Sequence, residues 1–193
     1  MESFNFFRVD PDTPVQDEPK FIVFLTCLVT LFSMYCFNCK YEKPDIEVNK
    51  NGTMVTVVQH CKSCKEAGKT PFKWCSQPFV FGRYPAGNLL LSFAILVAGA
   101  SVTKVLMVFS HMHLSVYTAH TFFMHQRRYI FPTVMTFWES TRSGMIKSAK
   151  MAKESIWAGD GRFDSMGHCA KYGAYTMLCS SIGKIVHFEL LQV

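Results

Sequence analysis

Four cysteines are spaced so that they could bind a metal ion. Cys36 and Cys39 form one Cys-x-x-Cys motif, and Cys61 and Cys64 form a second. Four thiolates are the ligand set of a closed, tetrahedral zinc site. The 21 residues between the pairs lie just beyond the spacing of about 15–20 residues that is usual for this pattern. Disulfides and unrelated buried thiols are the alternatives. The pattern predicts a structural Zn²⁺ held by all four cysteines.

Two aspartates near the end of the chain, Asp160 and Asp164, could serve a different metal chemistry. Alternating residues predict strands over 171–179 and 184–192, joined by a turn at 180–183. An acid at the end of a first strand, followed by such a meander, is how a nuclease sheet of the RNase H type begins. That site gathers carboxylates around two divalent ions such as Mg²⁺. The alternative is that both aspartates cap turns.

A third group of residues could contact nucleic acid. The pattern predicts short helices over 88–98, 102–110 and 116–126, with Ser101 and Ser115 as candidate N-caps. Three short helices separated by tight turns are typical of a helix-turn-helix, in which the third helix enters the major groove. Unrelated helical packing gives the same spacing. The predicted DNA-contacting residues are Tyr117, Thr118, His120, Thr121 and His125 for the bases, with Arg127 and Arg128 near phosphates.

The residues around the cysteines predict the element that holds them. Asp45–Lys50 and Thr53–Gln59 read as strands around Asn51-Gly52, a dipeptide favoured in a tight type I′ hairpin. A third strand over 70–75 closes a small sheet. We therefore expect a zinc ribbon over 36–75.

Composition and charge divide the rest of the chain. The first 19 residues contain five acidic side chains and one arginine, the reverse of the basic start of a secretory signal peptide. We therefore expect an intracellular compartment with reduced thiols, which favours metal over disulfide. Residues 20–155 carry a net charge of +10, which the acidic first 19 residues reduce to +6 for the whole chain, and such a basic region is typical of a nucleic-acid-binding protein. The predicted fold class is α+β, with these parts: an acidic disordered lead (1–19), an apolar helix (20–35), the zinc ribbon (36–75), a linker (76–87), a helical DNA-binding region (88–155) and the start of an RNase H-like domain (156–193).

Two hydrophobic runs support a rival hypothesis. Residues 21–39 carry no charge, and spans near 21–37 and 88–110 would make the chain a small multi-pass membrane protein. Against this, Thr26, Thr30 and Ser33 recur at helical spacing, which favours a packed helix with one polar stripe.

Several motifs together resemble a widespread group of animal proteins derived from DNA transposons. The motifs are the two cysteine pairs, Pro85–Leu91, Gly99–Leu106, Thr121–Phe123, Ala170–Tyr172 and Gly159-Asp-Gly-Arg-Phe-Asp-Ser165, the most specific of them. The resemblance covers about residues 20–193 and implies a cut-and-paste transposase with a zinc ribbon, a helix-turn-helix and a DDE-type core of RNase H fold. It also implies that Asp160 is the first catalytic carboxylate, with Asp164 the weaker candidate.

The sequence departs from that group in two ways. Met166 stands where a proline is expected, and after Asp164 only Glu189 could supply a further carboxylate. The resemblance therefore implies a nuclear, catalytically incomplete DNA-binding fragment that uses Zn²⁺ structurally and would need Mg²⁺ only if the nuclease site were completed. Its expected partners are duplex DNA and a second copy or a fuller-length relative. A zinc-dependent interaction module is a further alternative.

Overall fold

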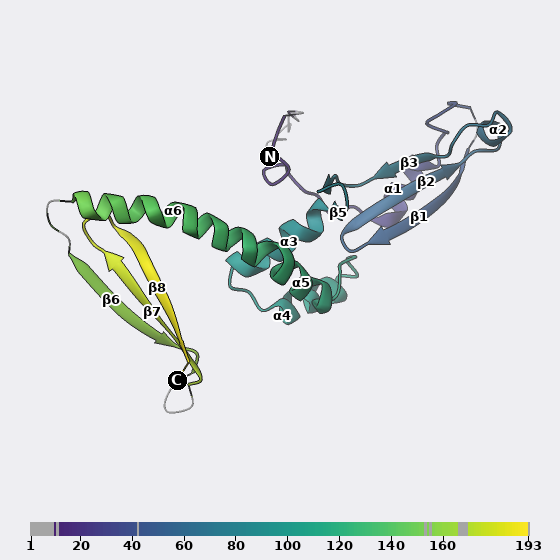
Figure 1. Ribbon diagram of the computed structural model, residues 1–193. Helices are drawn as coiled ribbons and strands as arrows, with labels where there is room; N and C mark the ends of the chain where they lie inside the picture. Colours follow the sequence, from purple (N-terminus) through teal and green to yellow (C-terminus); the bar gives the residue numbers. More distant parts are fainter. Residues whose placement is uncertain are drawn as a thin grey trace, which may run out of the picture. The chain divides into compact units, whose positions relative to one another are not determined.

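The structure is a computed structural model that describes residue 10 and residues 12–41, 43–152, 154, 156–165 and 170–192. Within these residues the fold is α+β, as the sequence predicts, and it contains helices and three small antiparallel sheets (Figure 1). The chain forms two compact units, Met1–Gln126 and Arg127–Val193. The boundary divides the region predicted as one helical part, 88–155.

The first sheet has the order β1-β2-β3 and consists of β1 (Asp45–Asn51), β2 (Met54–His60) and β3 (Phe72–Cys75). Asn51 pairs with Met54, so the hairpin turn is Gly52-Thr53, one residue later than Asn51-Gly52. Of these two turn residues Gly52 alone has a positive φ, +61°, which fits a type II′ turn better than the predicted type I′. The hairpin itself is confirmed.

A short helix and aromatic side chains complete the ribbon, the name used here for residues 25–75. Helix α1 (Leu25–Phe32) covers only part of the predicted helix 20–35. Its last residue, Phe32, is buried with its ring centroid 5.0 Å from that of Trp74 on β3. Helix α2 (Lys62–Glu66) follows β2 directly. Packing of Phe32 against β3 therefore brings the chain before the first cysteine pair onto the sheet.

Three helices follow a short β-ribbon of β4 (Phe79–Val80) and β5 (Tyr84–Pro85), in the region predicted as a linker. They are α3 (Ala86–Val97), α4 (Val102–His111) and α5 (Ala119–His125). Their small core contains the buried Ile95, Tyr117 and Phe122. Helices α3 and α4 are joined by a tight turn, at which Gly99 takes a φ of +61°. The connection from α4 to α5 is longer, 112–118, so the second tight turn expected of a helix-turn-helix is absent here.

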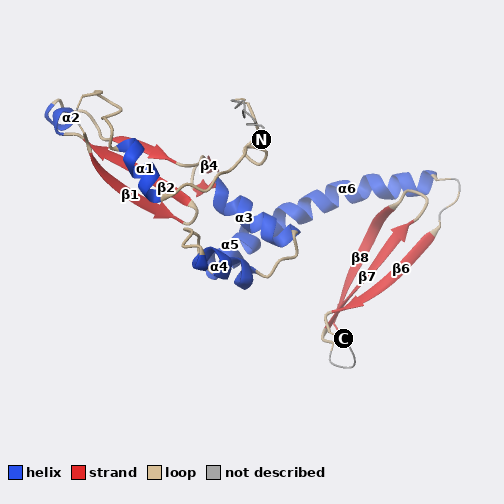
Figure 2. Cartoon of the chain, turned by 180° about the vertical axis from the view of Figure 1, so that it is seen from behind, coloured by secondary structure: helices blue, strands red, loops and turns tan. Residues whose placement is uncertain are grey.

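The second unit contains one long helix and a meander of strands. A π-helical turn, η1 (Gln126–Ile130), leads into α6 (Phe131–Met151). Pro132 fits the first turn of α6, where no intrahelical N–H bond is lost, and the helix continues through Gly144. The strands are β6 (Trp157–Phe163), β7 (Tyr172–Cys179) and β8 (Lys184–Gln192), each antiparallel to the next (Figure 2).

The unit's core lies where α6 meets this sheet. Ala149 of α6 packs with Cys179 and Val186, and all three are buried. The Trp138 ring lies 5.1 Å from that of Phe188. The meander predicted for 171–192 is therefore confirmed and is held by α6.

Most of the predicted acidic lead, residues 1–9 and 11, lies outside the described residues, and so does Met166. In the described part of the chain, no helix has the length and apolarity to cross a membrane.

Candidate metal centre

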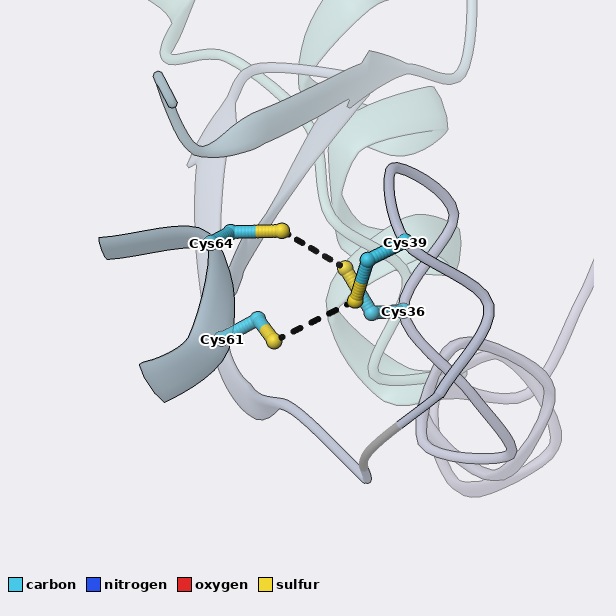
Figure 3. A group of neighbouring side chains, drawn as sticks. All are labelled: Cys36, Cys39, Cys61 and Cys64. Carbon is cyan, nitrogen blue, oxygen red and sulfur yellow. Dashed lines mark hydrogen bonds between the residues drawn. The ribbon is translucent and has the colours of Figure 1, made fainter. Parts of the chain in front are cut away.

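The four cysteines of the ribbon meet in one cluster (Figure 3). All four sulfur atoms lie within 4.8 Å of one another, with Cys36 Sγ 3.7 Å from Cys64 Sγ and Cys39 Sγ 3.6 Å from Cys61 Sγ. Four sulfurs at a Zn–S distance of about 2.3 Å would stand about 3.8 Å apart along the edges of a tetrahedron. A disulfide needs about 2.0 Å, and all four cysteines are free thiols. The geometry therefore fits a four-thiolate metal site.

Local backbone turns present the sulfurs in pairs. The Lys40 N–H donates to the Cys36 carbonyl at 2.8 Å, which closes the first turn, and Lys40 has a φ of +66°. In the second pair the Lys65 N–H donates to the Cys61 carbonyl at 3.0 Å, and the Lys69 N–H donates to the Cys64 carbonyl at 2.8 Å. Each Cys-x-x-Cys motif is thus one tight turn with both sulfurs on its inner side.

Gln59 joins the two turns and was not anticipated from the sequence. Its side chain, 1% exposed, lies on β2 two residues before the second cysteine pair. Its Nε2 donates to the Phe32 carbonyl at 2.6 Å and to the Tyr35 carbonyl at 3.1 Å, while its Oε1 accepts from the Phe37 N–H at 2.9 Å. These bonds hold the backbone on both sides of Cys36 against β2. Gln59 is therefore a positioning residue for the metal site.

The pKa values of two of these thiols, Cys39 and Cys64, are shifted in opposite directions. The Tyr41 backbone N–H donates to the Cys39 sulfur and lowers the pKa of that thiol to about 7. Burial raises the pKa of Cys64 to about 12, so a metal ion must displace a proton there. Four protein ligands leave no open coordination position, which is the arrangement of a structural site. The described residues contain no other group of three or more His, Cys, Asp or Glu side chains placed to share a metal ion.

The residues predicted to contact bases separate into buried and exposed side chains. Tyr117 and His125 are 7% and 3% exposed, so their assignment as groove-facing residues is wrong. Both bond to the buried Ser92 hydroxyl of α3, with Tyr117 OH at 2.7 Å and His125 Nδ1 at 2.9 Å. Burial raises the pKa of Tyr117 and lowers that of His125. His125 therefore holds α5 to α3, and Tyr117 holds the connection that precedes α5 to the same helix.

The remaining predicted DNA contacts lie at the surface. Thr118 caps α5 through its hydroxyl, which accepts from the Thr121 N–H at 3.5 Å. Ser115, predicted as this cap, instead donates to the Gly52 carbonyl at 2.7 Å, because the helix begins three residues later. His120 is exposed on α5, and Arg127 and Arg128 are exposed on η1. Fewer DNA-contacting side chains than predicted are therefore accessible to a ligand, because Tyr117 and His125 are buried.

The carboxylates do not converge. Asp160 lies in the middle of β6, not at its end, and pairs with Thr176, which pairs with Phe188. Glu189 pairs with Tyr175, the neighbour of Thr176 along β7. Because successive residues of a strand face opposite sides, Asp160 and Glu189 project from opposite faces of the sheet.

Asp164 and Glu189 have other partners. One Asp164 oxygen accepts from the Lys171 N–H at 3.2 Å, which is the turn-capping role considered as the alternative. Glu189 lies 3.3 Å from His187 on the same strand. Neither side chain is directed toward Asp160 by its contacts.

Sequence reasoning missed three buried polar residues, Gln59, Asn88 and Ser92. The available signal was a polar side chain within an otherwise apolar stretch: Gln59 lies between Val57 and Cys61 at strand spacing, and Asn88 and Ser92 lie one turn apart in an apolar helix. In comparisons with family models, with curated proteins and with solved structures, nothing matches this chain.

Proposed function

We propose that this chain is a transposase-derived, duplex-DNA-binding protein whose ribbon is held by a structural Zn²⁺. The observation that carries the proposal is the four-sulfur cluster in a ribbon that forms one compact unit with helices α3–α5. Thiolate ligands in a tetrahedral set favour zinc over magnesium, calcium or manganese, which prefer oxygen. When bound, the ion supplies cross-linking of the two cysteine turns and no open position for catalysis.

Surface charge supports DNA as the partner. Arg127 and Arg128 are exposed on η1, and α6 adds the exposed Lys147 and Lys150 against one acid, Glu139. Arg142 on the same helix is half-buried and bonds to His187 at 3.0 Å, so it is not counted among these cations. Cations spaced along a helix are suited to phosphates, which account for most of the affinity of nonspecific DNA binding. His120 on α5 offers ring nitrogens that could read a base edge. A nuclear location follows from this partner.

The sheet β6–β8 supports a protein without nuclease activity. A two-metal site requires several carboxylates around ions about 3.5–4 Å apart. Asp160 and Glu189 project from opposite faces, and Asp164 is engaged by the Lys171 backbone. We therefore propose that these strands are a catalytically incomplete relative of an RNase H-like core.

Fluorescence anisotropy with labelled duplex DNA tests the proposal. The zinc-loaded protein should bind with an affinity that falls steeply from low to physiological salt, and replacing Arg127 and Arg128 with alanine should reduce the salt slope by about 2. A matched variant, Lys171→Ala with Lys184→Ala, removes the same charge from the strand segment and should leave the slope unchanged. A folded, zinc-loaded sample that shows no binding at low salt would refute DNA as the partner.

A further inference from the structure

The turn of the β1–β2 hairpin is held by side chains from the helical part of the same unit. Asn88, near the start of α3, accepts from the Thr53 N–H at 2.7 Å and from the Thr53 hydroxyl at 2.9 Å. Its Nδ2 donates to the Asn51 carbonyl at 3.1 Å. From the other side the Ser115 hydroxyl donates to the Gly52 carbonyl at 2.7 Å. We call these contacts the hairpin clasp.

The clasp is a close fit between backbone and side chain. A Cβ at Gly52 would lie 2.4 Å from the Asn88 Oδ1, and the φ of +61° at Gly52 also favours glycine. Gln77 adds a bridge, since its Nε2 donates to the Thr53 hydroxyl at 3.2 Å and its Oε1 accepts from the Gly87 N–H. Asn88 itself is 4% exposed. Because a buried amide without partners is costly, the clasp and the start of α3 stabilise each other.

Hydrogen bonds along one face of α3 link the hairpin clasp to α5. Ser92 lies one helical turn after Asn88, is fully buried, and bonds to the Asn88 carbonyl at 3.0 Å. The same hydroxyl reaches Tyr117, which precedes α5, and His125 of α5. Polar contacts therefore run without a break from the hairpin turn through α3 to α5.

The cysteine cluster and the clasp lie at opposite ends of the hairpin. Cys61 follows the last residue of β2, whereas Thr53 precedes its first residue, and a strand of this length spans roughly 25 Å. Helix α2, which carries Cys64, lies at the end of the hairpin away from its turn (Figure 1). A site of four thiolates forms only when the ribbon is folded, so metal binding and folding of the ribbon are one equilibrium. Whatever stabilises the hairpin also presents its turn to Asn88 and Ser115.

We propose that the hairpin clasp couples metal binding at the four cysteines to the order of α3–α5. Loss of the metal unfolds the ribbon, withdraws Asn51 and Thr53 from Asn88, and leaves that amide and the α3 face behind it without partners. This inference rests on the zinc part of the proposed function and not on DNA binding. If DNA is the partner, the clasp makes the helix that carries His120 available only in the zinc-loaded protein.

Hydrogen–deuterium exchange of the full chain, without DNA, tests the coupling. Removing zinc with a chelator should speed exchange by tenfold or more in wild-type peptides from β2, α3 and α5. In Asn88→Ala, exchange in β2 should still respond to zinc, while exchange in α3 and α5 should no longer do so. An exchange rate in α3 and α5 that ignores zinc in the wild type would overturn the proposal, as would a full response in Asn88→Ala.

Zinc affinity supplies a second, reciprocal measurement. Coupling free energies are equal in both directions. Asn88→Ala should therefore weaken zinc binding and also abolish the effect of zinc on hydrogen exchange in α3 and α5. Asn49→Ala is the matched control: Asn49 is exposed on the same hairpin and donates to Glu47 at 2.7 Å, and its loss should leave zinc affinity unchanged.

A milder variant covers the case in which Asn88→Ala does not fold. Ser115→Ala removes a single hydroxyl and should reduce the zinc response of α3 and α5 without abolishing it; an unchanged response would count against the clasp. A wild-type protein that binds no zinc would be recognised by an unresponsive β2 and would refute the proposed function instead.

Discussion

Gln59 provides the sharpest test of how the metal site is built. Gln59→Met keeps the length of the side chain but removes its hydrogen bonds to Phe32, Tyr35 and Phe37. Each bond contributes about 1 kcal/mol net, so the zinc-loaded protein should lose about 3 kcal/mol of unfolding free energy. At about 1.4 kcal/mol for each tenfold, zinc affinity should fall about 100-fold, because the site forms only in the folded ribbon. All four cysteines remain in this variant.

Competition with a calibrated zinc chelator measures this loss. His60→Ala is the control, because His60 is the next residue, is exposed, and directs its ring to Glu47 at the surface. Gln59→Glu should be more damaging than Gln59→Met, since a carboxylate would place oxygens against the Phe32 and Tyr35 carbonyls. A Gln59→Met protein that holds zinc within twofold of the wild type would refute the positioning role.

Three further outcomes are expected. Metal analysis should return about one zinc per chain, and Cys61→Ser should lose it; full retention would rule out the four-cysteine site. Since burial lowers the pKa of His125 below its ordinary value of 6.5, the unfolded state binds more protons as pH falls, and stability should decline from pH 7 to 5. Urea titrations should show this decline weakened in His125→Asn and kept in His120→Asn. Labelled duplex in Mg²⁺ or Mn²⁺ should stay uncut; cleavage that disappears in Asp160→Ala would contradict the catalytically incomplete sheet.

The features that the sequence predicted correctly are set by local patterns. The spacing of the paired cysteines is visible within each short motif. In the ribbon and in β7–β8, apolar and polar residues alternate along short segments, and each pair of strands is joined by a turn within the same segment. The turn of the first hairpin was misplaced by one residue because Asn-Gly usually occupies both central positions. Here Gly52 takes the first central position, and Asn51 pairs with Met54 as the last residue of β1.

The errors arose where tertiary contacts decide which side of a helix is buried. Tyr117 and His125 are polar, and a helix examined alone assigns such residues to solvent. In the structure both turn toward Ser92, whose hydroxyl satisfies them in the interior. No pattern within 116–126 contains that information, because the partner lies on another helix. The carboxylates illustrate the same point, since only the pairing of β6–β8 shows that Asp160 and Glu189 face opposite sides.

The buried polar residues that sequence reasoning overlooked are also those that fix the arrangement of this unit. An apolar side chain at 59, 88 or 92 would be compatible with many packings of the ribbon and helices. A buried amide or hydroxyl is stable only where its partners are, and leaving one unpaired costs about 1–3 kcal/mol. Gln59 thus selects one position for the first cysteine turn, Asn88 selects one docking of the hairpin turn, and Ser92 selects one placement of α5. Sequence alone reveals that such a residue is polar; its partners, and therefore its function, lie in the contacts between elements.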